Sequence, residues 1–176
     1  MITRMISRAA FAALLLLPGA ALAQAQKPDD AQIAHIAYTA GALDIAAAKQ
    51  AMAKASNPDV RAFAQEMARD HQAVNDKALA LVKKLNVTPQ DNSTSQALSK
   101  DAAAHLARLG ALSGAAYDRA YVQNEVAFHK TVNGALQDTL IPSARNGELK
   151  ALLRTGLALF QGHQEHAEHI ARTLGQ

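Results

Sequence analysis

The sequence predicts an all-α protein built as a four-helix bundle. Of its 176 residues, 49% are hydrophobic but only 4% are aromatic, a composition that suits close-packed helices better than a β-sandwich. Apolar residues recur with helical periodicity through four long segments. Helix-capping residues and breaks that contain proline separate these segments, so each one is expected to form a helix.

The N-terminus has the features of a cleavable signal peptide at residues 1–23. Arg4 and Arg8 give it a charged start, a short apolar stretch follows, and it ends in the small-x-small pattern Ala-Leu-Ala. The apolar stretch is too short to span a bilayer, and no later segment comes close. We therefore expect a mature domain at residues 24–176, exported to the periplasm. The absence of cysteine argues against a lipid anchor, and an uncleaved amphipathic anchor is the alternative.

The charge balance bears on the class of partner. The predicted leader holds two of the 18 basic residues and none of the 15 acidic ones, which leaves the mature chain with a net charge of +1. That balance, without a basic run, gives no electrostatic reason to expect binding to nucleic acid or to an anionic membrane. No segment identifies a protein partner, and the sequence leaves open whether the chain forms a homo-oligomer.

Caps and breaks place the helices. Asn57 is a good N-cap followed by Pro58 at the first helical position, and Pro142 is expected to stop the third long helix. The four long helices are expected at residues 30–56, 58–85, 113–141 and 146–174, with a loop at 86–95 and a short helix at 96–109. Two tight hairpins joined by one long connection form the single-crossover arrangement of ferritin-like folds. An up-down-up-down bundle is the alternative.

Ionisable residues interrupt the apolar face of every predicted long helix. Five of them lie within about one turn of the helix midpoints, and they are Asp44, His71, Glu125, His129 and His163. In either topology they gather at one level inside the bundle. Glu125 and His129 are four residues apart on one face, so both can reach the same point. Since each buried ionisable group without a partner costs several kcal/mol, the five call for a shared explanation.

A bound transition metal is one such explanation, because carboxylates and neutral imidazoles are its ligands. The mixed nitrogen and oxygen donors favour zinc or copper, while iron and manganese also fit, and no organic cofactor is implied. Ligating histidines must be neutral, so affinity is expected to fall below about pH 6.5. The alternative is a metal-free network in which protonated histidines pair with the two carboxylates and fix the helix register.

Five further residues have weaker claims to this centre, namely Asp118, Asp70, His166, Met67 and Tyr121. Asp118 lies two turns from Glu125 and either supports it or acts as an acid of the first helical turn. Asp70 either orients a histidine or is solvated. Met67 is expected to fill the core, although its thioether suits copper(I), and Tyr121 is expected to pack. His166 lies at the edge of its stripe, and the histidines expected in solvent are His35, His105 and His169.

Two segments carry longer motifs, VRAFAQEMARDHQAVNDKALALVKKL at residues 60–85 and AYDRAYVQNEVAFHKTV at residues 116–132. Together with His163, they resemble the domain of unknown function 4142 family. That family lies in the ferritin-like superfamily and consists mostly of exported bacterial proteins, so the resemblance implies an exported helical bundle. The family usually has glutamate where Asp44 stands, and it has no settled biochemical role.

The sequence thus favours an exported metal-binding protein, with two hypotheses beside it. Ferritin-like di-iron sites use four carboxylates and two histidines with Glu-x-x-His pairs, which this chain lacks, so ferroxidase chemistry is not implied. A redox or hydrolytic metalloenzyme would need an open coordination position and a path for substrate. A metal-free envelope or stress protein would act through its surface, and whether the protein is an enzyme stays open.

Overall fold

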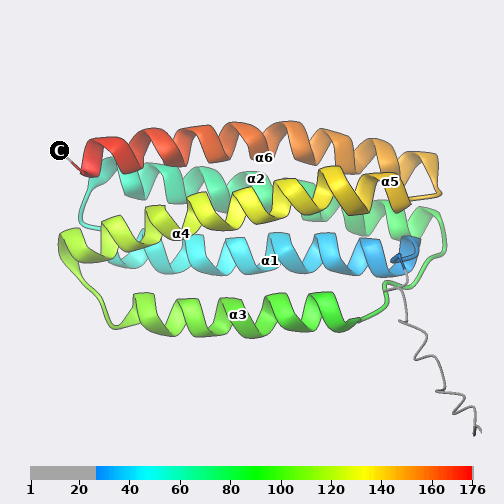
Figure 1. The fold of residues 1–176 in the computed structure, drawn as a ribbon, viewed down its shortest axis with the longest axis horizontal. Coiled ribbons are helices and arrows are strands. Elements are labelled where there is room, and N and C mark those ends of the chain that lie inside the picture. The colour runs from blue at the N-terminus through cyan, green and yellow to red at the C-terminus, as the bar shows by residue number, and fades with distance from the viewer. Residues whose placement is uncertain (1–26, 176) are drawn as a thin grey trace, which may run out of the picture.

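Four long helices and one shorter helix lie side by side in the computed structural model, which describes residues 27–175 (Figure 1). The predicted signal peptide lies outside these residues. The elements are α1 (Asp30–Lys54), α2 (Pro58–Lys84), α3 (Ser93–Gly110), α4 (Gly114–Ala135), η1 (Leu136–Leu140), α5 (Ile141–Ser143) and α6 (Gly147–Leu174). The described part of the chain contains no strand, so the prediction of an all-α fold is confirmed.

The topology is that of two helical hairpins joined by one long crossover. α1 packs on α2, and α4 with its extensions packs on α6, while α3 lies outside these four helices against α1 and α4 (Figure 1). Because α3 carries the chain back along the length of the bundle, α2 and α4 run in the same direction. This is the single-crossover arrangement of ferritin-like folds, in place of the up-down-up-down alternative.

Side-chain caps begin the second helix of each hairpin. The Asn57 Oδ1 atom accepts hydrogen bonds from the backbone of Asp59 and Val60, at 2.8 and 3.2 Å. Asn146 does the same at the start of α6, with Oδ1 accepting from two backbone N–H groups at 2.9 and 3.0 Å. These bonds satisfy N–H groups that have no partner within the helix, which explains why both helices begin close to their predicted residues.

A carboxylate from the opposite hairpin fastens each tight turn. Asp118 of α4 accepts hydrogen bonds from the backbone of Ser56 and Asn57, at 3.0 Å each, and from the Ser56 hydroxyl. Asp30 of α1 accepts from the backbone N–H groups of Arg145 and Asn146, at 2.8 and 2.9 Å. The Asp118 carboxylate is therefore occupied at one end of the bundle, where it holds the α1–α2 turn.

The third long helix differs from its prediction near its end. It does not stop before Pro142 but passes through the π-helix η1 and continues as α5 to Ser143. Within the wider turn, the Ile141 N–H donates to the Leu136 carbonyl, five residues back. In a regular α-helix the proline ring would clash with the carbonyl of Asp138, four residues earlier. The π turn directly precedes the proline, so the helix continues past Pro142 instead of ending there.

Within residues 27–175, the hydrophobic core consists of two clusters, one towards each end of the bundle. One cluster includes Phe63, Met67 and Tyr121, and the other includes Ile33, Leu153 and Phe160. On each of the four bundle helices, the predicted metal ligands fall between the residues of one cluster and those of the other. The ionisable side chains thus form a polar layer between two apolar ones.

Candidate metal centre

Five ionisable side chains from four helices meet in this polar layer. They are Asp44 of α1, His71 of α2, Glu125 and His129 of α4, and His163 of α6, and each is only 1 to 2% exposed. His71, His129 and His163 each place one ring nitrogen within 4.8 Å of the others. Asp44, Glu125 and His129 form a second such group. His129 belongs to both groups, so it lies at the middle of the cluster.

Three of the donor atoms form a nearly equilateral triangle. The Nε2 atoms of His71 and His129 are 3.4 Å apart, and the Asp44 Oδ2 atom lies 3.4 Å from the first and 3.7 Å from the second. The point equidistant from the three corners of such a triangle lies about 2.0 Å from each, which is the usual length of a zinc bond to nitrogen or oxygen. A single ion at this point would contact all three atoms without movement of the backbone.

Hydrogen bonds on the far side of two rings determine which nitrogen faces the interior. The His129 Nδ1 atom lies 3.0 Å from the Glu125 carbonyl oxygen, which can only accept, so Nδ1 carries the proton and Nε2 presents a lone pair to the triangle. His163 Nε2 donates to Asp70 Oδ2 at 3.1 Å, and its buried Nδ1 has no partner. Partners of this kind orient the histidine ligands of metal sites.

Several buried polar atoms at the centre lack a hydrogen-bond partner. They are both carboxylate oxygens of Asp44, the Oε2 atom of Glu125, and the Nδ1 atoms of His71 and His163. An unsatisfied buried polar atom costs about 1–3 kcal/mol. A concentration of such atoms in one layer of the bundle indicates a site shaped for something other than packing.

Burial shifts the pKa of each ionisable group at the centre in the direction that favours its neutral form. It raises the pKa of Asp44 from 3.8 to about 7 and raises that of Glu125 well above its ordinary value, with further repulsion from Asp44. It lowers the pKa of His71 to about 2 and that of His129 to about 4, and it also lowers the pKa of His163. The imidazoles are therefore neutral at physiological pH, as metal ligands must be.

These shifts bear on two of the sequence-based expectations. The short contacts from His71 and His129 to Asp44 are ion pairs only if the rings are protonated, and their lowered pKa values leave them neutral near pH 7. A network of imidazolium–carboxylate pairs is thus disfavoured. The expected loss of metal affinity below about pH 6.5 assumed an unperturbed histidine. At the centre burial instead raises the pKa of Asp44 to about 7, so this carboxyl group titrates near neutrality.

The weaker candidates divide between the site and its surroundings. Asp70 contacts the site through His163, and Arg69 and His163 hold the pKa of its carboxyl low, so it is not simply a solvated residue. Met67 and Tyr121 are fully buried in one apolar cluster, where the Tyr121 ring stacks on Tyr117 at 6.3 Å. The Tyr121 hydroxyl is buried without a partner.

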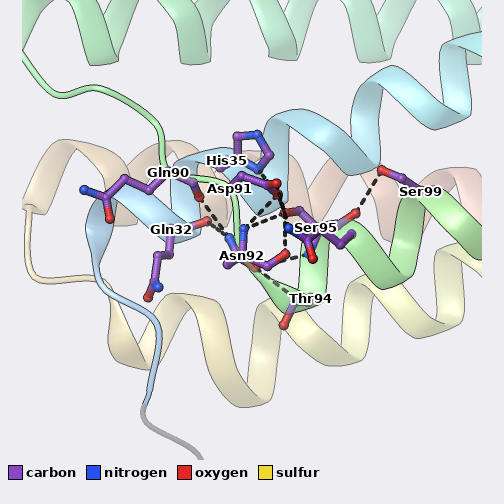
Figure 2. A network of polar contacts seen from close by, with 9 residues as sticks. Gln32, His35, Gln90, Asp91, Asn92, Thr94, Ser95 and Ser99 are labelled. Atoms are coloured by element: carbon purple, nitrogen blue, oxygen red, sulfur yellow. Dashed lines mark hydrogen bonds and ion pairs between the residues drawn. The ribbon is translucent and has the colours of Figure 1, made fainter.

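The remaining histidines lie outside the centre. His166 is exposed and contacts Glu66, with 2.9 Å between Nδ1 and Oε2. His105 and His169 are exposed as expected, whereas His35 is half-buried, with its Nδ1 atom 3.8 Å from Asp91 Oδ1. The expectation that His35 is solvated is therefore wrong, because the loop before α3 folds back over α1 (Figure 2).

Sequence reasoning missed one neighbour of the ligands. The Phe160 ring stacks on the His71 ring, with 4.5 Å between ring centroids and 7° between planes, and it meets His129 edge-on at 6.2 Å. Phe160 lies one turn before His163 on α6, and the sequence could not identify the histidine that it covers. The stacking holds the His71 ring in the plane that directs Nε2 at the triangle.

Two cavities approach the centre from different sides. One of about 190 Å³ lies between α1, α3 and α4 and reaches Asp44 and Glu125, with Asp101 and His105 of α3 in its lining. The other, of about 330 Å³, is mainly apolar and reaches His71 and His129. The carboxylates and the imidazoles are therefore approached through separate spaces.

In the described part of the chain, no helix is long and apolar enough to cross a bilayer.

Comparison with known proteins agrees with the resemblance inferred from the motifs. No curated protein sequence matches the chain. A crystal structure of a DUF305 protein from Streptomyces coelicolor, described as secreted, has a TM-score of 0.61 at 15% identity, covering 82% of this chain and 88% of that chain. This likeness shows a shared fold. The family model for the domain of unknown function DUF4142 matches residues 16–170, so the chain belongs to the DUF4142 family.

Proposed function

We propose that this protein is an exported metal-binding protein that holds one transition-metal ion in the polar layer of its bundle. The observation that carries the proposal is the triangle of donor atoms from Asp44, His71 and His129, whose sides of 3.4, 3.4 and 3.7 Å suit a single ion. His163 would add its unpartnered Nδ1 atom as a fourth donor. Glu125 would neutralise the ion from beside it or complete its coordination.

The donor set favours zinc or copper(II). Three imidazoles and one or two carboxylates are ligands of intermediate softness, which these ions accept with high affinity, and iron or manganese would bind the same set more weakly. A bound cation would offset the cost of burying Asp44 and Glu125, since it replaces the protons that burial otherwise retains on them. The neutral histidines need lose no proton to bind.

Export rests on two supports of a different kind. The predicted signal peptide at residues 1–23 has a charged start, an apolar stretch and a small-x-small end. The structurally similar DUF305 protein is described as secreted. We therefore place the metal-binding role outside the cytoplasm, in the periplasm, where the chain would acquire its metal after crossing the membrane.

Metal titration of the chelator-treated protein tests the proposal. Calorimetry with Zn²⁺ and with Cu²⁺ is expected to give one equivalent bound, and elemental analysis of protein purified from periplasm is expected to identify the native ion. His129→Ala should lose this binding, because its Nε2 atom is one corner of the triangle. His169→Ala, an exposed histidine on α6, is the matched control and should bind as the wild type does.

Two results would contradict the proposal. The first is the absence of a stoichiometric site in folded wild-type protein. The second is an affinity in His129→Ala equal to that of His169→Ala, which would move any metal to surface histidines. The first result would favour the metal-free bundle that acts through its surface, and the second would show that the polar layer is not the metal site.

A further inference from the structure

A mainly apolar cavity of about 330 Å³ occupies the half of the bundle that holds the N-terminus of α1 and the beginning of α6. Side chains of α1, α2, α4, η1 and α6 line it, with a contribution from the start of α3. Almost all of its lining is hydrocarbon. The polar side chains at its inner end are His71, His129 and Asn75.

Small residues create this space. Ala40 and Ala78 line the cavity, and a larger side chain at either position would take up part of its volume. Asn75 is held in place by its own contacts, since its Nδ2 atom donates to the Tyr38 carbonyl at 3.3 Å and its side chain fits closely against Gly41. The Nδ2 donor of Asn75 is therefore engaged, and the two imidazoles are the ionisable groups at the inner end.

The volume sets the size of the ligand. An apolar protein cavity of roughly 150 Å³ holds a benzene molecule. The present cavity has about twice that volume and would take about ten to twelve carbon atoms. Burial of each methylene group contributes about 0.8 kcal/mol, so a chain of this length would gain substantial binding energy from hydrocarbon contacts alone.

The cavity has an opening between α3 and the later part of α4. Its exposed lining residues include Thr94, Thr131 and Thr139. A polar network fixes the start of α3 beside this opening (Figure 2). In it, the buried Ser95 hydroxyl donates to Asp91 at 2.7 Å, and the Gln90 N–H donates to the Ala31 carbonyl at 3.0 Å. The rim of the opening is thus a fixed part of the fold.

We propose that the cavity binds a medium-chain aliphatic molecule of about ten to twelve carbon atoms, whose single polar end group meets His71 and His129. The hydrocarbon part of the proposal depends only on the cavity. The choice of end group rests on the proposed metal site. In the metal-free protein a carboxylate end would lose its hydration with no positive charge beside it, so a neutral hydroxyl end is accepted, whereas a bound cation would favour a carboxylate end.

Calorimetric titration with 1-decanol and with decanoate, each in metal-free and zinc-loaded protein, tests this assignment. We expect 1-decanol to bind both forms with one site, and zinc to strengthen decanoate binding by roughly tenfold or more, which equals about 1.4 kcal/mol. Ala40→Leu, which places three further carbon atoms in the cavity, should weaken both ligands by roughly tenfold or more. Ala151→Leu adds the same atoms at an exposed position on α6 and should leave both affinities unchanged.

Each outcome has a separate meaning. If neither molecule binds, or if folded Ala40→Leu binds as well as Ala151→Leu does, the cavity proposal is overturned. Ala78→Leu replaces Ala40→Leu if circular dichroism shows that the latter is unfolded. If both molecules bind but zinc leaves decanoate unaffected, the orientation towards the histidines is wrong. If 1-decanol binds and the protein takes up no metal, the cavity stands and the metal proposal fails.

Discussion

The substitution Asp44→Asn should stabilise the metal-free protein at alkaline pH, although it alters a fully buried side chain. Asp44 sits between neutral imidazoles and the carboxyl group of Glu125. Neither of its oxygens has a hydrogen bond of normal geometry, and the lowering of its pKa by Glu125 is smaller than the increase caused by burial. Its charged form is therefore expensive in the absence of a cation. Asparagine has nearly the same shape and cannot ionise, so the substitution removes the charge and keeps the packing.

The magnitude follows from the pKa of Asp44, which burial raises from 3.8 to about 7. Because the folded protein binds this proton more tightly than the unfolded chain does, the proton stabilises the fold. This contribution is fully present below pH 3.8 and is lost as pH rises through about 7. At pH 8 the loss amounts to about 4 kcal/mol, and at pH 5 to about 2 kcal/mol. The buried amide, left without partners, costs about 1–3 kcal/mol at both pH values. The difference in unfolding free energy between Asp44→Asn and the wild type should therefore change by about 2–3 kcal/mol in favour of the variant from pH 5 to pH 8.

Urea unfolding with a chelator, at several pH values between 5 and 8, measures this difference. Asp76→Asn removes an exposed carboxyl of α2 and serves as the control, with a flat difference from the wild type. Excess zinc should shift the difference in favour of the wild type, because an ion at a hundred times its dissociation constant stabilises the wild type by about 2.7 kcal/mol and the variant by less. A stability difference for Asp44→Asn that does not change with pH would refute the reasoning, since it would mean that Asp44 ionises without cost.

Three further predictions concern the site and its support. Asp70→Asn should weaken metal binding by about 10- to 100-fold in calorimetry, because it removes the partner of the His163 Nε2 atom, while Asp76→Asn should leave affinity unchanged. Metal affinity should fall as pH decreases below about 7, because protons compete with the metal for Asp44. When affinity is measured against pH, Asp44→Asn should show a shallower fall than the wild type. An equally steep fall in the two proteins would mean that Asp44 is not the group that titrates. Asp118→Ala should lower the free energy of unfolding by about 2–3 kcal/mol through loss of its bonds to the α1–α2 turn, with metal stoichiometry unchanged. Loss of metal binding in that variant while it remains folded would place Asp118 at the centre after all.

The helices and their polar interruptions could be predicted from the sequence because both depend on local rules. Asn57 with Pro58 begins a helix by cap chemistry, and the apolar period of each segment fixes which side chains face inward. Since the segments have similar lengths, residues near their midpoints meet at one level in either topology. The meeting of Asp44, His71 and His129 therefore followed from counting along each helix.

Contacts between helices could not be predicted in the same way, because they depend on the rotation of each helix about its axis. The periodicity of its helix places Asp70 at the edge of the apolar stripe. It does not predict the hydrogen bond to His163, because that residue lies on α6. Asp118 has the periodicity of an interior residue, yet its carboxylate binds a turn that is distant in sequence. The π turn before Pro142 is similarly a response of the packed helix to proline, which local stop signals do not describe.

The costly polar layer is tolerated because the rest of the bundle holds the helices in place on either side of it. Asp118 and Asp30 fasten the two tight turns, at opposite ends of the bundle, and an apolar cluster packs between each turn and the layer. A layer held at both ends cannot relieve its unpaired atoms by shifting a helix, since any shift would break one cluster or one turn. The donor atoms of His71 and His129 are thus kept 3.4 Å apart by packing elsewhere, and a cation is the component that would turn this imposed proximity from a cost into a gain.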